Sequence, residues 1–276
     1  MQFYLLGYPL GHSMSPFLHQ AFLSQAKLEG HYELKEISPK TFSEEVTRLK
    51  EMGCDGFNIT IPYKVDILPF LDRVDSEAEA IGAVNTVVVE DDKWIGYNTD
   101  GRGYVTSLKY HFPALFTTKS RFLVLGAGGA SRGIVHALNN EICDAITVCN
   151  RTVEKADALL ESLSGSKQLA GISYEEAEKT LDMYDCIINT TSVGMEPHTR
   201  NQAISLKHLS KDTVVSDIVY KPFHTTLLQD AKKRGAQIHH GHEMLVYQAA
   251  LAFKLWTGFT VDVRPVIQAF EEKLIK

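Results

Sequence analysis

The chain has 276 residues, 44% of them hydrophobic, and a formal net charge of −6. That size predicts a large core and two domains. The acidic balance and the lack of a basic stripe argue against nucleic-acid binding, and no apolar run is long enough to cross a membrane. The N-terminal segment MQFYLLGYPLGHS has no basic lead-in and is broken by Gly7 and Pro9. We therefore expect no signal peptide and a cytoplasmic protein.

The cysteines are four in number: Cys54, Cys143, Cys149 and Cys186. They form no close CxxC pair, so their spacing suggests neither a zinc knuckle nor a disulfide framework. Three lie beside apolar, strand-like residues, which predicts buried free thiols. The segment HHGHE at His239–Glu243 has metal-binding residue types. We interpret it as a loop leading into a helix, and we expect no metal.

Apolar runs alternate with helical patterns along the N-terminal part of the chain. Strands are predicted at 3–7, 32–37 and 56–61, and helices after Pro16 and over 42–52. Short helical material follows. The runs AVNTVVVE (83–90) and KWIGYN (93–98) then predict a hairpin around Asp91 and Asp92, followed by a helix from about Gly101.

A second alternating series opens with RFLVLG at 121–126, so the segment YHFPALFTTK at 110–119 marks the expected domain border. Strands are predicted at 121–126, 145–150, 185–190 and 213–218, and helices over 130–140, 154–163, 225–235, 242–256 and 262–275. Strands that alternate with helices in this way predict an α/β fold with parallel sheets.

The segment GFNITIPYK at Gly56–Lys64 alternates apolar and polar side chains. The apolar face would hold Phe57, Ile59, Ile61 and Tyr63, and the polar face Asn58, Thr60, Pro62 and Lys64. The alternation predicts a strand with one apolar face. The polar face presents an amide, a hydroxyl and an amine, which are groups that bind a polar ligand.

The segment FLVLGAGGASRG carries the strongest local chemistry. A buried apolar strand runs directly into Gly126, Ala127, Gly128 and Gly129, and a helical pattern follows. Such glycines let the turn close and let a pyrophosphate approach the main chain, while the helix N-terminus supplies N–H groups and a positive dipole end. Ser131 replaces the third glycine of the usual fingerprint. A tight strand–helix connection is the alternative, but strand and helix are both present, which favours dinucleotide binding.

The next strand, AITVCNRTVEK, indicates which dinucleotide binds. An NAD site usually ends this strand with an acidic residue that bonds the ribose 2′-hydroxyl. This chain has Asn150, Arg151 and Thr152 there, with Lys155 one turn on. A guanidinium attracts a 2′-phosphate and can pair with two of its oxygens. The alternative, a solvated cation at a helix start, is disfavoured by the helix dipole, so the strand predicts NADP.

Polar residues in the N-terminal part of the chain suit a substrate. GHSMSPFLHQAF places Ser15 before Pro16, as a helix N-cap followed by proline at the first helical position. With Ser13, this helix start also suits a carboxylate. Asn85 lies within an apolar run, and Asp100 follows the strand end GYNT. For these two residues, a turn position and a plain helix cap are the alternatives.

Nine segments in order resemble the shikimate dehydrogenase family: GHSMSP, NITIPYK, GAVNT, GYNTDG, GAGGASRG, NRT, NTTSVGM, DIVYKP and GHEMLVYQA. One such segment would be weak, but nine in register are specific. The small departure is Thr190, where the family usually has Ala or Cys. Its members are NADP-dependent reductases of 3-dehydroshikimate in aromatic amino-acid biosynthesis.

The resemblance implies two α/β domains with the substrate cleft between them. An N-terminal substrate-binding domain would span 1–108, and a Rossmann-type dinucleotide-binding domain with a parallel sheet would span 109–240. C-terminal helices over 241–276 would pack back on the first domain. The partners would be NADP and a small molecule, shikimate or 3-dehydroshikimate, in a monomer or homodimer.

The resemblance also implies residue roles, with Lys64 as the catalytic residue and Asp100 as its partner. The substrate would be held at its carboxylate by Ser13, Ser15 and Tyr220, and at its hydroxyls by Thr60, Asn85, Asp100 and Gln248. The pyrophosphate would be carried by Gly126, Gly128, Gly129 and Ala130, with Ala127 between them. The adenosine phosphate end would meet Asn150, Arg151, Thr152 and Lys155, and the nicotinamide would meet Ile218 and Gly241.

Hydride transfer to the substrate ketone would leave a developing alkoxide that needs a proton. Lys64 can donate one as an ammonium group, whereas Asp100 is too acidic to do so unless its pKa is raised. Which residue transfers the proton stays open. The other interpretations are a dehydrogenase that also accepts quinate, often with NAD, and a non-catalytic NADPH-binding sensor. The absence of an acidic residue after AITVCN argues against the NAD form, and a sensor would not need Lys64 and Asp100 together.

Overall fold

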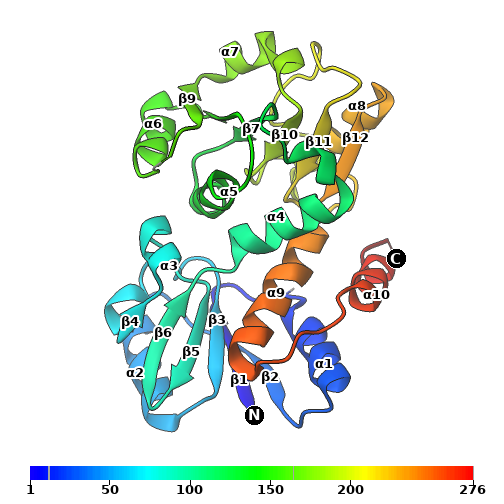
Figure 1. Cartoon of the computed structure of the whole chain (residues 1–276). Coiled ribbons are helices and arrows are strands. Elements are labelled where there is room, and N and C mark those ends of the chain that lie inside the picture. Colours follow the sequence, from blue (N-terminus) through cyan, green and yellow to red (C-terminus); the bar gives the residue numbers. More distant parts are fainter. Residues whose placement is uncertain (12, 164, 276) are drawn as a thin grey trace. The chain divides into compact units, whose positions relative to one another are not determined.

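The computed structural model describes residues 1–11, 13–163 and 165–275 (Figure 1). The chain folds into two compact units. Unit 1 comprises Met1–Thr99 and Val246–Val266, and unit 2 comprises Asp100–Leu245 and the residues from Ile267 onward. The sequence-based domain boundaries after residues 108 and 240 stay a prediction, although the end of the chain groups with unit 2 rather than with unit 1.

Unit 1 is built on a six-stranded mixed sheet with the order β2-β1-β3-β5-β6-β4. Its strands are β1 (Gln2–Gly7), β2 (His31–Glu36), β3 (Gly56–Ile59), β4 (Arg73–Val74), β5 (Thr86–Glu90) and β6 (Lys93–Tyr97). β1 runs parallel to β2 and β3, whereas β5 is antiparallel to both β3 and β6. The predicted hairpin is confirmed: Asp91 and Asp92 turn with φ of 50° and 61°, as a two-residue type I′ turn requires.

Helices cover both faces of this sheet. They are α1 (Ser15–Ala26), α2 (Phe42–Met52), α3 (Ser76–Ile81) and the part of α9 (His242–Thr257) from Val246 onward. On one face, Phe42, Val46 and Leu49 of α2 join a buried cluster with the sheet. On the other face, the ring of Trp256 in α9 stacks on Phe3 of β1 with centroids 4.6 Å apart. The strands between them are therefore buried on both sides.

The strand predicted over GFNITI ends earlier than expected. β3 stops at Ile59, and the chain turns from Ile61 onward. Ile61, placed on the apolar face by the alternation, is 72% exposed. The reason is local, because Pro62 has no N–H group with which to continue the ladder. The predicted polar strand face is therefore wrong beyond Ile59, and Lys64 lies in a turn.

Unit 2 is built on a six-stranded parallel sheet with the order β12-β11-β10-β7-β8-β9. Its strands are β7 (Arg121–Leu125), β8 (Ala145–Cys149), β9 (Gln168–Ile172), β10 (Cys186–Asn189), β11 (Val214–Asp217) and β12 (Gln237–His240). Read from β9, this is the strand order of a Rossmann fold. The α/β fold predicted from the sequence is thereby confirmed. The edge strands β9 and β12 were not predicted, because their side chains are mostly polar or only half-buried.

Side chains of β7 alternate between two buried clusters. Phe122 and Val124 face one cluster, and Leu123 and Leu125 the other. The helices of this unit are α4 (Asp100–His111), α5 (Gly129–Asn139), α6 (Val153–Glu161), α7 (Tyr174–Lys179), α8 (Thr226–Lys233), the start of α9 and most of α10 (Arg264–Ile275). A sheet with helices on both faces places its ligand site at the carboxyl ends of the strands.

The cysteines and the helices bear on two sequence-based expectations. Cys143, Cys149 and Cys186 are buried free thiols, as predicted, and Cys54 is a partly buried free thiol. Across the described residues, every helix falls short of the length or apolarity that a membrane span requires.

Candidate active site

A buried group of amides and hydroxyls lies within unit 1. The hydroxyl of Tyr32 donates to Oδ1 of Asn58 at 2.8 Å. Nδ2 of Asn58 donates to Oγ1 of Thr86 at 3.0 Å and to the carbonyl of Asn85 at 3.1 Å. These hydrogen bonds fix the ends of β3 and β5 against each other. Asn58, part of the predicted polar strand face, is thus a structural anchor that is only 5% exposed.

Asn85 is the centre of this group. Its Oδ1 accepts from Oγ1 of Thr86 at 2.9 Å and from the main-chain N–H of Thr99 at 2.8 Å. Its Nδ2 donates to Oγ1 of Thr99 at 3.0 Å and to Oε1 of Gln248 at 3.3 Å. The structure therefore brings together two predicted substrate residues, Asn85 and Gln248, from β5 and α9. Thr99 directly precedes Asp100 in the chain, so the same group holds the main chain that leads to that carboxylate.

Lys64 is presented by a turn whose flanks are fixed. The N–H of Tyr63 donates to the carbonyl of Thr60 at 3.0 Å, and the N–H of Val84 donates to the carbonyl of Lys64 at 2.8 Å. Tyr63 is buried and stacks on Phe42 with ring centroids 4.0 Å apart. Because Val84 is next to Asn85 in the chain, the main chain of Lys64 is tied to the polar group described above. The side chain of Lys64 is half-buried.

Ser13 and Ser15 lie together at the start of α1, as predicted, but their local roles differ from the prediction. The helix begins at Ser15, its N-cap is Met14, and no side-chain cap bond forms there among the described residues. The prediction of Ser15 as the N-cap is therefore wrong by one position. Oγ of Ser13 instead lies 3.3 Å from both the N–H and the Oγ of Ser15. The two hydroxyls thus face the same helix start.

In unit 2, the loop between β7 and α5 contains glycines of two kinds. Gly126 has φ of +101°, and a Cβ there would lie 2.8 Å from Cγ2 of Thr191, so the fold itself requires this glycine. Gly128 and Gly129 are exposed, and a Cβ at either would meet no heavy atom of the described residues within 4 Å. The fold does not explain these two glycines. The open space above them is what a pyrophosphate needs in order to reach the main chain.

The serine that departs from the glycine fingerprint closes this loop. Ser131 is fully buried, and its Oγ donates to the carbonyl of Gly126 at 2.7 Å. Thr190, which departs from the family pattern, donates through Oγ1 to the carbonyl of Leu125 at 2.7 Å. Both hydroxyls therefore stabilise the end of β7. Neither departure removes a feature that the nucleotide loop needs.

The segment after β8 lies beside this loop. The N–H of Gly126 donates to the carbonyl of Cys149 at 2.7 Å, so the next residue, Asn150, is near the glycines. Nδ2 of Asn150 donates to the carbonyl of Thr152 at 2.8 Å. Arg151, Thr152 and Lys155 are exposed, and within the described chain the Thr152 side chain does not cap α6. A cationic, hydroxyl-bearing surface thus stands at the carboxyl end of β8.

The predicted nicotinamide residues Ile218 and Gly241 lie against each other. A Cβ at Gly241 would come within 2.3 Å of the carbonyl carbon of Ile218, so only glycine fits there. Tyr220 follows in the same loop, 6.1 Å from the ring of Phe270, and burial raises the pKa of its hydroxyl. These residues follow β11 and β12, at the same edge of the sheet as the glycine loop.

A buried carboxylate, Asp217, holds the loops after β10 and β11. It accepts from Nδ2 of Asn189 at 2.9 Å, from Oγ1 of Thr225 at 2.7 Å and from the N–H of Val219 at 3.0 Å. Burial raises its pKa to about 6, although these three hydrogen bonds act in the opposite direction. Asn189 and Asp217 open the segments NTTSVGM and DIVYKP, but no sequence motif predicted that they pair. The signal was a polar residue at the last position of each buried strand.

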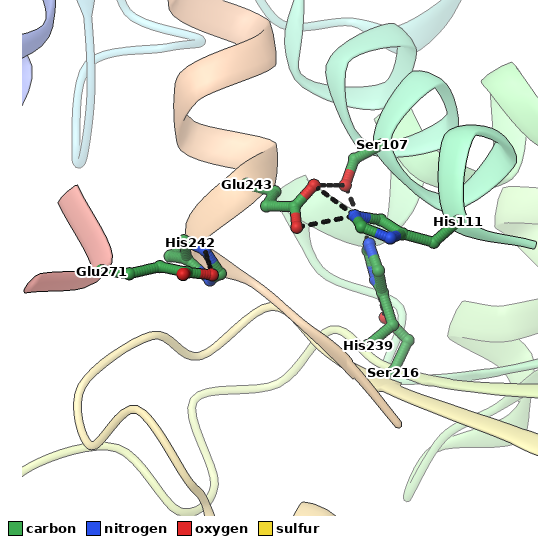
Figure 2. Close-up of polar contacts among 7 residues, drawn as sticks. All are labelled: Ser107, His111, Ser216, His239, His242, Glu243 and Glu271. Carbon is green, nitrogen blue, oxygen red and sulfur yellow. Dashed lines mark hydrogen bonds and ion pairs between the residues drawn. The ribbon is translucent and has the colours of Figure 1, made fainter. Parts of the chain in front are cut away.

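In a second buried network of unit 2, the hydrogen bonds are all donated in the same direction along a chain of side chains (Figure 2). The hydroxyl of Tyr104 donates to Oγ of Ser216 at 2.7 Å, and Oγ of Ser107 donates to Oε2 of Glu243 at 3.1 Å. Between them, His239 contacts Ser216 through Nδ1 and Ser107 through Nε2, each at 2.8 Å. Each hydroxyl has one hydrogen to give. His239 must therefore accept at Nδ1 and donate from Nε2.

The far end of this network is the carboxylate of Glu243. His111 contacts both of its oxygens through Nε2, at 2.7 and 2.9 Å. Burial, aided by the neighbouring histidines, lowers the pKa of His239 to about 3, so its ring is neutral at neutral pH. Two residues of the HHGHE segment, His239 at the end of β12 and Glu243 in the first turn of α9, thus belong to this structural network.

Models of known families match three stretches of the chain. Residues 5–87 match the shikimate dehydrogenase substrate binding domain, and 111–220 match shikimate / quinate 5-dehydrogenase. Residues 241–269 match the shikimate 5′-dehydrogenase C-terminal domain. Together these stretches span most of the chain. The chain belongs to the shikimate dehydrogenase family. The resemblance predicted from the nine segments is thereby confirmed.

Relatives support the shikimate dehydrogenase assignment along the full length. A shikimate dehydrogenase (NADP+) of Oceanobacillus iheyensis is 50% identical over 273 residues, which cover 98% of this chain and 97% of that protein. The crystal structure of a shikimate dehydrogenase in complex with NADP+ has a TM-score of 0.91 at 36% identity and covers 100% of this chain and 96% of that one. The Thermus thermophilus enzyme in complex with NADP(H) and shikimate has a TM-score of 0.87 at 33% identity, with 99% of each chain covered.

Membership of this NADP-dependent shikimate dehydrogenase family makes the chain an oxidoreductase. The individual site residues stay predictions. Within each unit, however, the structure places them in coherent groups. In unit 1, Asn85 and Gln248 belong to one hydrogen-bonded group, and a main-chain hydrogen bond from Val84 ties the turn of Lys64 to it. In unit 2, the loop of Gly126 lies beside Asn150.

Proposed function

We propose that this chain catalyses the reversible NADPH-dependent reduction of 3-dehydroshikimate to shikimate. Family membership supports the reaction. The observation that carries the assignment of roles is the hydrogen-bonded group around Asn85. It combines buried amides and hydroxyls with the anchored turn of Lys64, and such groups suit a small polyhydroxylated acid. A buried, pre-oriented set of this kind loses little entropy when it binds its ligand.

The residues of unit 2 fit NADP. The first-turn N–H groups of α5 and the open main chain at Gly128 and Gly129 would hold the pyrophosphate, flanked by Gly126, Ala127 and Ala130. Arg151 would pair with the 2′-phosphate, assisted by Thr152, Lys155 and Asn150. Ile218 and Gly241 would line the nicotinamide. When bound, NADPH supplies the hydride.

The substrate carboxylate would be held by the hydroxyls of Ser13, Ser15 and Tyr220. Ser13 and Ser15 would act with the N-terminal dipole of α1. The ring hydroxyls would be bound by Thr60, Asn85, Asp100 and Gln248. Asn85 already orients Gln248 through their hydrogen bond of 3.3 Å, so the two amides would act as one unit.

Lys64 would give a proton to the alkoxide oxygen that develops when the ketone is reduced. An ammonium group can donate a proton to the alkoxide, and a carboxylate can accept a hydrogen bond from a hydroxyl. Asp100 would therefore orient Lys64 and accept a substrate hydroxyl. In the oxidation direction, neutral Lys64 would be the base.

Steady-state kinetics with two substrates and two cofactors test this function. Shikimate and quinate are each oxidised with NADP+ and with NAD+, and kcat/KM is compared. We expect the highest value for shikimate with NADP+. A chain that turns over neither substrate with either cofactor would be a binding protein, and the proposed function would be wrong.

The alternative is a dehydrogenase of broader range that also accepts quinate, because one of the matching family models is described as shikimate / quinate 5-dehydrogenase. The same experiment separates the two functions. Equal kcat/KM values for shikimate and quinate would favour the broader enzyme, and a preference for NAD+ would contradict the role assigned to Arg151.

A further inference from the structure

An imidazole and two carboxylates converge in unit 2 at the junction of α9 and α10 (Figure 2). His242 and Glu243 are the first two residues of α9, and Glu271 lies in α10. One ligand atom from each of the three side chains lies within 4.8 Å of the other two. None of these three residues is among those assigned above to NADP or to the substrate, although His242 directly follows Gly241.

His242 is the most informative member. Its side chain is 2% exposed, and its Nε2 lies 2.9 Å from Oε1 of Glu271. Neither ring nitrogen makes a hydrogen bond among the described residues. Nε2 of His242 and Oε1 of Glu271 are therefore close, but their geometry is not that of a hydrogen bond. A buried polar side chain without hydrogen bonds in a native fold calls for an explanation such as an ion.

The carboxylates add a second argument. The Glu243 side chain is buried and that of Glu271 is 38% exposed. Two like charges this close repel each other, and a divalent cation between them turns this repulsion into attraction. Glu243 is already oriented, because its oxygens accept from His111 and Ser107 at 2.7–3.1 Å. A carboxylate has about four acceptor positions, so Glu243 can bind a metal while it keeps these partners. Hydrogen bonds of this kind orient metal ligands in known sites.

We propose that His242, Glu243 and Glu271 form a binding site for a divalent transition metal, with Zn²⁺ as the preferred ion. Nε2 of His242 and one oxygen from each carboxylate would be ligands, and water would complete the coordination. Zn²⁺ accepts nitrogen and oxygen ligands together, whereas Mg²⁺ and Ca²⁺ prefer oxygen alone. The metal would link α10 to the start of α9 and would take no part in hydride transfer. The sequence analysis expected no metal in this segment.

Metal binding to the purified full chain tests the proposal. After treatment with a chelator, the protein is titrated with Zn²⁺ by calorimetry, and its Tm is measured with and without the ion. We expect about one Zn²⁺ per chain and a rise in Tm of several degrees at about 100 times the Kd. Glu271→Gln keeps the shape of the side chain but removes the charge. It should weaken binding by about tenfold or more, since even the loss of an outer-shell partner typically costs about 10–100-fold in metal affinity.

Matched variants identify the site. Glu272→Gln changes the neighbouring, exposed glutamate and should leave the Zn²⁺ affinity unchanged. His224→Asn tests whether Zn²⁺ binds elsewhere, at the pair formed by His224 and His240, since Nδ1 of His224 lies 3.1 Å from Nε2 of His240. Co²⁺ in place of Zn²⁺ gives visible absorption bands that should disappear in Glu271→Gln. The proposal is overturned if wild-type protein binds no Zn²⁺, if Glu271→Gln binds as tightly as wild type, or if only His224→Asn weakens binding.

Discussion

In unit 1 the candidate substrate residues Asn85 and Gln248 are part of the buried scaffold, whereas in unit 2 the candidate cofactor residues Gly128, Gly129 and Arg151 lie at the surface. Asn85 and Gln248 are less than 10% exposed and bond to each other. Gly128, Gly129 and Arg151 are exposed. The buried groups also differ in kind. Around Asn85 they are neutral amides and hydroxyls, but in unit 2 they include the carboxylates of Asp217 and Glu243 and the imidazoles of His239 and His242.

This difference has a consequence for substitutions. A residue that is both scaffold and ligand cannot be changed without a cost in stability, since its removal leaves buried partners unpaired. A residue that lies exposed above the scaffold can be removed with a loss of binding alone. Each of the following predictions uses that contrast.

The largest expected effect is acid unfolding that begins in unit 2. Burial lowers the pKa values of His239 and His242 to about 3 and that of His240 to about 4, and in unit 1 it lowers that of His19 to about 3. The unfolded chain binds protons from about pH 6.5 downward and the folded chain does not, so stability falls as the pH drops below that value. At pH 5, each fully buried histidine lowers the free energy of unfolding by about 2 kcal/mol relative to its value above pH 6.5. Asp217, with its raised pKa, acts in the opposite direction between about pH 4 and 6.

The two tryptophans, Trp94 and Trp256, both belong to unit 1. Tryptophan fluorescence therefore reports on unit 1, while circular dichroism reports on the whole chain. We expect the dichroism to change at a higher pH than the fluorescence as the solution is acidified. Coincident transitions, or a fluorescence change that comes first, would contradict the assignment of the acid-sensitive groups to unit 2.

The next largest effect is that of Lys64→Ala on turnover. Loss of a positioned acid or base should lower kcat by about 10²–10⁴-fold, with little change in KM for shikimate. The matched control is Lys40→Ala, which removes an exposed lysine of the same unit. Near-normal turnover of the Lys64 variant in a steady-state assay would show that the proton comes from another group.

Arg151→Ala should weaken the binding of NADPH and leave the binding of NADH nearly unchanged, because only NADPH carries the 2′-phosphate. Loss of a hydrogen bond to a charged group costs about 1.5–3 kcal/mol, or about tenfold to a hundredfold in affinity. Stability should not change, since Arg151 is exposed. Fluorescence titration with both cofactors measures the ratio, with Arg234→Ala as the control arginine. An equal loss for the two cofactors would remove the basis of the phosphate assignment.

Asn85→Ala should behave in the opposite way to Arg151→Ala. It removes the partner of Thr86, Thr99 and Gln248 in a buried site, and each unpaired polar group costs about 1–3 kcal/mol. The free energy of unfolding, measured in urea, should therefore fall, and the KM for shikimate should rise. If KM rises while the stability is unchanged, Asn85 is a ligand without a scaffold role.

The smallest expected effect on stability is that of Gly128→Ala, which is compared with Gly101→Ala in the same unit. At Gly101, a Cβ would lie 1.9 Å from the carbonyl oxygen of Gly133, so Gly101→Ala should destabilise the fold by about 1–3 kcal/mol. At Gly128, a Cβ meets no described heavy atom within 4 Å. Gly128→Ala should leave the Tm unchanged and weaken the binding of NADPH. A loss of Tm at Gly128 comparable to that at Gly101 would mean that the fold itself requires this glycine.

The sequence predicted the strand–helix order well where the patterns were long and apolar, as for β7 and α5. It failed for β9 and β12, because edge strands bury only part of their side chains and lack the apolar signal. It also placed Lys64 at the end of a polar strand face, because the alternation of side chains continues past Pro62 while the ladder of main-chain hydrogen bonds does not.

For the candidate site, sequence motifs named the residues but not the bonds between them. Asn58 and Asp217 were visible as polar residues beside apolar strands, yet their roles depend on partners far along the chain, such as Tyr32 and Thr225. Such pairings follow from the strand order, which no local pattern encodes. The convergence of His242 with Glu271 was hidden for the same reason, since α9 and α10 are separated in sequence.

The contact between Gly101 and Gly133 bears on catalytic distance as well as stability. Gly101 follows Asp100, the first residue of α4, and Gly133 lies in α5, the helix that begins at the glycine loop. Main chain touches main chain there, so no flexible side chain can absorb an error in the spacing between Asp100 and that loop. A methyl group at Gly101 would have to move from 1.9 Å to an ordinary contact distance. That displacement exceeds about 1 Å, an error that can lower a rate about 10²-fold. The separation of the proposed acid–base partner from the cofactor site is thus set by two missing side chains.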